Sequence, residues 1–181
     1  MIAKRILPPP STLDPILASY VPGPGALLQV LRQIQARFHH IPAWAIDTLA
    51  TQWQLSYAAI RSVIGFYHFL SFEHRGQYTV YLSDSVTDRM LGSEALLQRL
   101  CERLQIEPGQ TRPDLRVSVH RTSCTGLCDQ GPAGLINGRP LTQLTPRRID
   151  EIATLIETAS PLDDWPVDFF AVHNPVGRHD L

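Results

Sequence analysis

Residues 115–138 read LRVSVHRTSCTGLCDQGPAGLING, and this stretch carries the pattern on which the fold prediction rests. Its first part alternates apolar and polar positions through Leu115, Val117 and Val119, which is the period of a half-buried strand. Residues 133–136 are a second short apolar run, and the Asn-Gly pair directly after them is a strong hairpin signal. The stretch therefore predicts two strands separated by a loop that contains two cysteines.

The segments on either side complete an alternation of strands and helices. Before the stretch, residues 78–82 (YTVYL) have the β-branched and aromatic composition of a strand. The Gly-Ser pair at 92–93 then begins a helix whose apolar side chains share one face. After the stretch, the Thr-Pro pair at 145–146 is a typical helix start. The order strand, helix, strand, strand, helix predicts a thioredoxin-like α/β sandwich over residues 76–158.

Residues 25–72 show a helical period instead. The apolar positions of residues 27–38 recur every three or four places, as on one face of a helix. Pro42 suits the first turn of a second helix, and Ser56 suits the N-cap of a third. We therefore expect an N-terminal three-helix bundle followed by the sandwich, which is an α+β fold.

Both ends of the chain are expected to be extended arms. Residues 1–24 hold six prolines, which fix φ and remove backbone donors, so this arm is expected to lie outside the core. Residues 159–181 carry Trp165, Phe169 and Phe170 without a helical or strand period. Exposed rings of this kind predict a strap or connector that packs on a partner or on a domain that follows.

Composition excludes several classes of protein. A hydrophobic content of 44% with 18% charged residues excludes a disordered chain, and no apolar run approaches the roughly 20 residues that span a bilayer. The net charge is -1 and no basic block occurs, so nucleic acid is not an expected partner. The N-terminal segment lacks the apolar region of a signal peptide. We expect a soluble cytoplasmic protein that does not insert into membranes.

Cys124 and Cys128 are the sharpest candidates for chemistry. A glycine-containing turn of this kind can aim two sulfurs at one point. An iron or zinc site needs four ligands and this loop supplies two, so incidental thiols remain an equally supported alternative. A disulfide switch is a third reading, although the reducing cytoplasm opposes it. The third cysteine, Cys101, lies on an apolar helix face and is expected to be a buried thiol.

The chain resembles the 24-kDa-type subunit of respiratory complex I and its relatives in NAD-reducing hydrogenases and NAD-dependent formate dehydrogenases. The resemblance runs from about residue 26 to residue 156. It is carried by ARFHHIPAWAIDTLA and VIGFYHFL, and then by YTVYLSDS, CTGLCDQGPAGLING and LTPRRIDEI. The strings GLCDQGPAGLI, YLSDSV and FYHFL are most similar to the N-terminal domain of the diaphorase subunit of cytoplasmic NAD-reducing [NiFe] hydrogenases.

This resemblance implies a [2Fe-2S] site from which the sequence departs. The family holds its cluster with four cysteines, and the corresponding positions here are Ser83, Asp88, Cys124 and Cys128. Oxygen is a harder donor than thiolate, so Ser83 and Asp88 would be doubtful replacement ligands. We therefore expect that the cluster, although possible, is absent. Asp84 and Asp88 are otherwise expected to be solvated loop acids.

The resemblance also implies a function. It places the chain in the diaphorase part of an NAD-reducing hydrogenase, which passes electrons between H2 and NAD+ through FMN and iron–sulfur clusters. The chain is not expected to be catalytic alone, because it has no Gly-rich loop for FMN or NAD. Those cofactors are assigned to an adjoining flavin domain or partner subunit, and the other implied partners are the Fe-S and [NiFe] hydrogenase subunits. The alternatives are a [2Fe-2S] electron-transfer subunit of complex I or of formate dehydrogenase, and a purely structural docking module.

Overall fold

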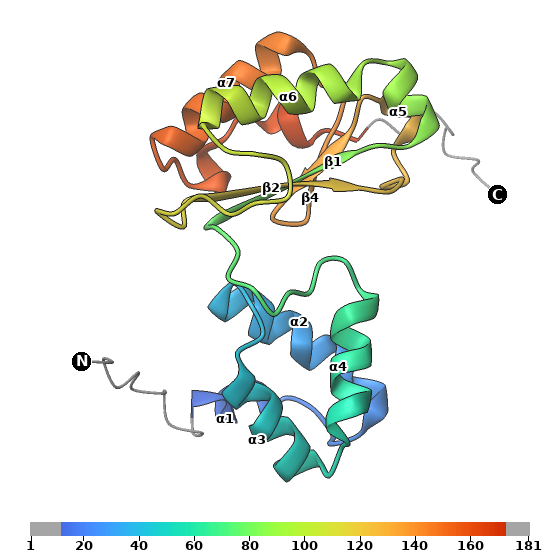
Figure 1. Cartoon of the computed structure of the whole chain (residues 1–181), viewed down its shortest axis with the longest axis vertical. Coiled ribbons are helices and arrows are strands. Elements are labelled where there is room, and N and C mark those ends of the chain that lie inside the picture. Colours follow the sequence, from blue (N-terminus) through green and yellow to red (C-terminus); the bar gives the residue numbers. More distant parts are fainter. Residues whose placement is uncertain (1–11, 173–181) are drawn as a thin grey trace, which may run out of the picture. The chain divides into compact units, whose positions relative to one another are not determined.

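The computed structural model describes residues 12–172, and Figure 1 shows their arrangement. The chain divides into two compact units, Met1–Arg75 and Gly76–Leu181. The outer parts of both predicted arms, residues 1–11 and 173–181, lie outside the described residues. Among the residues that the structure describes, no helix has the length and apolar character needed to cross a bilayer.

The first unit is helical and holds the three helices that the periodicity predicts. Its core is made by their apolar faces, with Leu31, Ile34 and Leu49 fully buried. Ser56 caps the last helix as expected, because its hydroxyl accepts a hydrogen bond from the Ala59 N–H. The elements are α1 (Asp14–Leu17), a 3-10 turn (Pro24–Ala26), α2 (Leu27–Phe38), α3 (Ala43–Trp53) and α4 (Tyr57–Phe66).

A fourth helix, α1, corrects the prediction for the N-terminal arm. Leu13 is fully buried in the core of this unit, and Ile16 and Leu17 are buried there as well. The prolines of this segment suggested that it contains no helix. Pro15, however, lies in the first turn of α1, where a backbone N–H would have no intrahelical partner. The unit is therefore built from more than a three-helix bundle.

The second unit is a four-stranded mixed sheet with helices. The strands lie in the order β2-β1-β3-β4, with β1 parallel to β2 and antiparallel to β3. The predicted alternation of strands and helices is present, and β4 is added as the second strand of a hairpin with β3 whose turn is the Asn-Gly pair. The elements are β1 (Tyr78–Ser83), α5 (Val86–Met90), α6 (Ser93–Leu104), β2 (Val117–Thr122), β3 (Gly134–Ile136), β4 (Arg139–Leu141) and α7 (Pro146–Glu157).

Helices α6 and α7 cover the same face of this sheet (Figure 1). Each buries one apolar stripe at helical spacing, which is why the sequence period located both helices. Thr145 caps α7 as predicted, since its hydroxyl accepts from the Arg148 N–H. Cys101 belongs to the stripe of α6 and is buried, in agreement with its expected role as a core thiol.

The strand predicted from Leu115 begins two residues later, at Val117. Leu115 is 45% exposed and has φ of 58°, because its N–H donates to the Arg112 carbonyl and closes a turn. Leu115 therefore belongs to this turn and not to the strand, although its spacing from Val117 fits a strand period.

The aromatic residues after α7 correct the prediction of an exposed strap. Trp165 and Phe169 are buried in the core of the second unit. The indole N–H of Trp165 donates to the Ser160 carbonyl at 2.9 Å, and its ring stacks on Tyr78 with centroids 6.0 Å apart. Arg148 lies over the Phe169 ring at 5.3 Å. These rings pack on the core of the unit to which they belong. The segment that carries them contains only short 3-10 turns, so its apolar residues show no helical or strand period.

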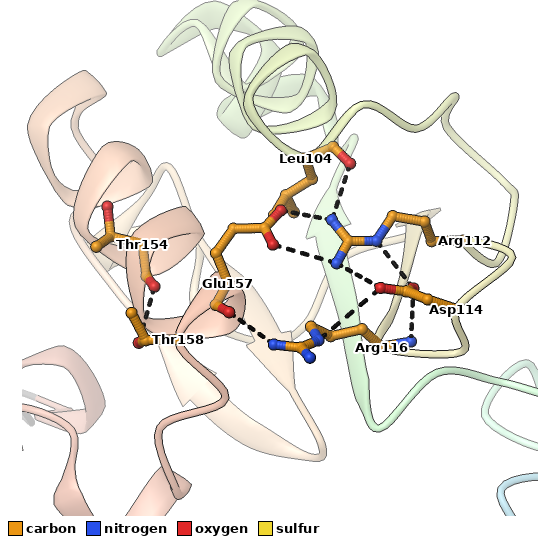
Figure 2. Close-up of polar contacts among 7 residues, drawn as sticks. All are labelled: Leu104, Arg112, Asp114, Arg116, Thr154, Glu157 and Thr158. Carbon is orange, nitrogen blue, oxygen red and sulfur yellow. Dashed lines mark hydrogen bonds and ion pairs between the residues drawn. The ribbon is translucent and has the colours of Figure 1, made fainter.

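An ionic network joins the ends of α6 and α7 to the turn before β2 (Figure 2). Arg112 donates to Asp114, Glu157 and the Leu104 carbonyl, and Arg116 donates to the Glu157 carbonyl. Arg112 holds the pKa of Asp114 at about 2, below the usual 3.8. The depressed pKa means that the ionised carboxylate stabilises the folded state.

This pKa predicts how the acid stability of the protein depends on Asp114. The folded pKa lies below the unfolded one, so the stabilisation is present above about pH 4 and is lost as pH falls towards about 2. We expect Asp114→Asn to unfold at lower urea concentration than wild type at about pH 6, and the two midpoints to converge near about pH 2. Asp164→Asn, at an exposed position, is the control. A midpoint difference that stays constant with pH would contradict the prediction.

Candidate functional site

The four positions singled out by the sequence lie at one edge of the sheet. β1 and β2 are parallel, with Ser83 in register with Thr122 at their carboxyl ends. Because parallel strands end at the same edge, the segment after β1 meets the cysteine loop after β2. The Asp84 N–H donates to the Thr122 carbonyl at 2.9 Å, and the Ser83 N–H donates to the Ala133 carbonyl at 3.0 Å. The spatial frame implied by the resemblance is therefore present.

Cys124 and Cys128 lie next to each other on this edge. Their Sγ atoms are 2.8 Å apart. Cys124 is exposed, and Cys128 is half-buried at the start of a 3-10 turn, Cys128–Gln130. Gly126 has φ of 80°, which favours glycine, and its N–H donates to the Cys124 sulfur at 3.3 Å. The turn thus brings the two sulfurs together, as the spacing suggested.

The two thiols are electrostatically different. The contact with Cys128 and the Gly126 N–H lower the pKa of Cys124, since both stabilise its thiolate. The same contact raises the pKa of Cys128, because a second negative charge beside the first is unfavourable. Burial raises the pKa of the third thiol, Cys101, to about 11. Cys124 is therefore the thiol best suited to react.

The oxygen donors at the other two positions are already used by the fold. Asp88 is 1% exposed, and its Oδ1 accepts from the Ala133 N–H at 3.0 Å. Its Oδ2 accepts from the Ser85 hydroxyl at 2.7 Å. The Ser83 hydroxyl is buried as well and accepts from the Ser85 N–H at 3.3 Å. The expectation that Asp88 is a solvated loop acid is wrong, because its carboxylate ties α5 to the segment before β3.

Residues that the sequence reasoning missed build this arrangement. Ser85 caps α5, since its hydroxyl accepts from the Asp88 N–H at 3.2 Å. The string Ser85-Val-Thr-Asp88 has the serine-x-x-acid spacing of a capping box, a signal that could have located both residues. Gly131 leaves room for the carboxylate, because a Cβ there would lie 2.6 Å from Asp88 Oδ1.

This donor set does not fit a [2Fe-2S] cluster. Such a cluster uses four thiolates, whereas two of the four positions are oxygen atoms committed to hydrogen bonds within the loops. Within residues 12–172, no group of three His, Cys, Asp or Glu side chains is placed so that it could share a metal ion. Ligation by Asp88 would compete with the hydrogen bonds that its two oxygens accept from the Ala133 N–H and the Ser85 hydroxyl.

Sequence comparison identifies the family to which a chain with this fold and this cysteine loop belongs. The model of the family described as thioredoxin-like [2Fe-2S] ferredoxin matches residues 13–157. The chain therefore belongs to the thioredoxin-like [2Fe-2S] ferredoxin family, and the predicted α+β, thioredoxin-like fold class is confirmed.

Its relatives include subunits of an NAD-reducing hydrogenase and of NADH-quinone oxidoreductases. The chain is 33% identical over 168 residues to the NAD-reducing hydrogenase HoxS subunit alpha of Cupriavidus necator, covering 92% of this chain and 27% of that one. It is 29% identical over 127 residues to a subunit of the NADH-quinone oxidoreductase of Escherichia coli K12, covering 70% of this chain and 76% of that one. The chain thus spans about a quarter of the length of the hydrogenase relative.

A solved structure gives the same relationship. The structure of an NAD+-reducing [NiFe]-hydrogenase in the H2-reduced state matches with a TM-score of 0.76 at 37% identity. The match covers 85% of this chain and 26% of that one. The predicted resemblance to this family, and within it to the hydrogenase branch, is confirmed.

Proposed function

We propose that this chain acts in the diaphorase part of an NAD-reducing hydrogenase, as a structural domain beside the flavin site. The similarity to the hydrogenase relative over 92% of the chain supports this assignment. The relative is far longer than the matched region, and the present sequence has no Gly-rich cofactor loop. We therefore assign FMN and NAD to an adjoining domain or subunit, with Fe-S and [NiFe] subunits as further partners. A cytoplasmic location is part of the same proposal.

The main support for a structural role is that the side chains at two of the four ligand positions, Ser83 and Asp88, make hydrogen bonds within the domain. The Asp88 carboxylate accepts hydrogen bonds from the Ala133 N–H and the Ser85 hydroxyl, and so fixes the edge of the sheet to which the resemblance assigns the family's cluster. A buried carboxylate that satisfies a backbone donor stabilises the loop that it joins. In this proposal the domain keeps the family's shape at that edge without holding a cluster, and electron transfer proceeds on its partners.

Exposed apolar side chains near this edge support a docking role. Val86 and Met90 of α5 are largely exposed, and Leu91 is more than half exposed. α5 begins at Val86, three residues after the end of β1, so this apolar surface belongs to the same edge as the cysteine loop. Exposed apolar residues that gather in one place are typical of interaction sites. We propose that the remainder of a longer flavoprotein covers them.

Isolation of the native assembly tests the functional assignment. The expected result is that the protein containing this chain co-purifies with FMN and reduces an artificial electron acceptor with NADH. Deletion of Gly76–Leu181 should lower the FMN content of that assembly, because the docking domain would be missing. An assembly without flavin, or FMN retention that does not depend on this unit, would contradict the proposal.

The absence of a cluster is tested separately by reconstitution. After anaerobic incubation of the full chain with iron and sulfide, we expect no bound iron–sulfur chromophore and no electron paramagnetic resonance signal after reduction. The reason is that the site offers two cysteine thiolates, whereas the cluster needs four soft ligands. A family member with four cysteines, treated in parallel, is the positive control. A stoichiometric [2Fe-2S] signal from the wild-type chain would contradict this prediction and support the electron-transfer alternative, in which Ser83 and Asp88 complete the ligand set.

A free subunit of a complex I-type enzyme is the second candidate. It is favoured by the match to the NADH-quinone oxidoreductase relative, of which the chain covers 76%. The two candidates differ in the mass of the native polypeptide. A native polypeptide that continues into a flavin domain supports the hydrogenase assignment, and one of about the present mass supports the free subunit.

A further inference from the structure

We propose that Cys124 and Cys128 form a redox-active dithiol, which exchanges two electrons with low-molecular-weight disulfides by closing to an intramolecular disulfide. The site is distinct in chemistry from an iron–sulfur cluster. It rests on the proposed function in one respect, namely that no cluster occupies the two thiols.

The distance between the sulfurs carries the inference. The Sγ atoms are 2.8 Å apart in the thiol state, and a disulfide bond is about 2.05 Å long. Closure therefore needs a movement of about 1 Å, within a loop that has only three residues between the cysteines. The left-handed Gly126 and its N–H bond to the Cys124 sulfur already hold this turn in shape. Little conformational freedom remains to be lost when the bond forms.

The accessibility of the three cysteines makes the reaction selective. Cys124 is exposed and Cys128 is half-buried, so a small disulfide reaches the first and the second attacks from beside it. Cys101 is buried in the core between α6 and the sheet. A thiol without access to the reagent does not exchange. The reaction is therefore confined to the loop at the edge of the sheet.

The polar side chains of Asp88 and Ser83 are hydrogen-bonded to other groups and not to the two sulfurs, so they do not oppose disulfide formation. The Asp88 carboxylate and the Ser83 hydroxyl are turned to internal hydrogen bonds with Ala133 and Ser85. Ser85, which caps α5, is close enough to Cys128 to lower the pKa of its thiol, so the pair lies beside the start of that helix. The dithiol is thus seated on a fixed part of the domain.

The chemistry balances with glutathione disulfide as the oxidant. The Cys124 thiolate attacks one sulfur of glutathione disulfide, forms a mixed disulfide and releases one glutathione thiolate. The Cys128 thiolate then attacks the Cys124 sulfur and releases the second glutathione thiolate. Two protein thiols lose two protons and two electrons, and one glutathione disulfide becomes two glutathione molecules. The reverse reaction with excess glutathione restores both thiols.

Equilibration of the purified full chain in glutathione buffers of graded ratio tests this site. The expected result is that both thiols of the loop become protected from alkylation together, with the loss of two hydrogens in the intact mass and without a glutathione adduct. Protection should be reversed fully by a dithiol reductant. Cys101→Ala is the matched control and should show the same transition. Free thiols at both loop positions in the most oxidising buffer would overturn the inference.

Single variants test the two-step chemistry. With Cys128→Ser, the second displacement is impossible, so we expect a stable glutathione adduct on Cys124 in place of the internal disulfide. With Cys124→Ser, we expect slower adduct formation, because the remaining thiol is half-buried. A persistent glutathione adduct in the wild-type protein would show that Cys128 does not resolve it, and would also overturn the inference.

Iron analysis of the same samples separates this inference from the proposed function. Iron bound at the two thiols, with protection lost on addition of a chelator, would contradict both. Metal-free protein whose thiols never pair would contradict the dithiol alone and leave the structural role in place.

Discussion

Replacing Trp165 by alanine is expected to lower the free energy of unfolding of the second unit by about 3–5 kcal/mol. The indole is 2% exposed, stacks on Tyr78 and meets Phe169 edge to face at a centroid distance of 6.4 Å. The substitution removes this apolar volume and leaves a cavity beneath the turns after α7. It also removes the donor to the Ser160 carbonyl, which still accepts from the Tyr78 hydroxyl at 2.7 Å.

Hydrogen exchange of the amides in β1 measures this effect in the unit that contains Trp165. Val167→Ala is the matched control, because Val167 is two residues away and 85% exposed, and a surface change of this kind is expected to stay within about 0.5 kcal/mol. Equal effects of the two variants would contradict the finding that the aromatic segment is core. They would instead favour the strap that the sequence suggested.

Replacing Asp88 by alanine is expected to cost about 3 kcal/mol of stability. The change leaves the Ala133 N–H without its acceptor in a buried position and releases the Ser85 hydroxyl from its partner. A hydrogen bond to a charged group contributes more than a neutral one, and a buried donor left unsatisfied adds its desolvation penalty. The cysteine loop should loosen as well, because Ala133 lies directly after it.

Asp88→Asn provides the conservative comparison, since its amide oxygen can still accept from Ala133. We expect it to lose about 1 kcal/mol, a neutral hydrogen bond in place of a charged one. Asp84→Asn, which removes a surface ion pair with Arg89, is the control. Urea unfolding gives the stabilities, and the alkylation rate of Cys124 reports the loop. If Asp88→Ala were as stable as wild type, the carboxylate would not have the structural role proposed for it.

Much of the fold could be predicted because amphipathic periodicity is a local property. The helices α2, α6 and α7 were located from the spacing of their apolar residues, and Thr145 and Ser56 from their capping chemistry. The predictions failed where this signal is weak. α1 is only four residues long and contains Pro15, and after α7 Trp165 lies between two single 3-10 turns, with Phe169 on the second.

The candidate site was predicted in part. Its four positions come from alignment with the family frame, and the structure does bring the segments that contain them to one edge of the sheet. The roles of Ser85, Gly131 and Ala133 were not predicted, although the capping spacing of Ser85 and Asp88 was visible. The burial of Asp88 could not be read from a loop of polar residues.

The sequence by itself determined the alternation of strands and helices and the loss of two of the family's four thiolates, since both are properties of residues at known spacing. Only the tertiary structure decided what the replacing oxygens do. Asp88 finds its donor at Ala133, 45 residues further along the chain, because β3 pairs antiparallel with β1 and so places Ala133 beside the end of β1. Such a hydrogen bond depends on the packed position of both segments, which no local pattern specifies.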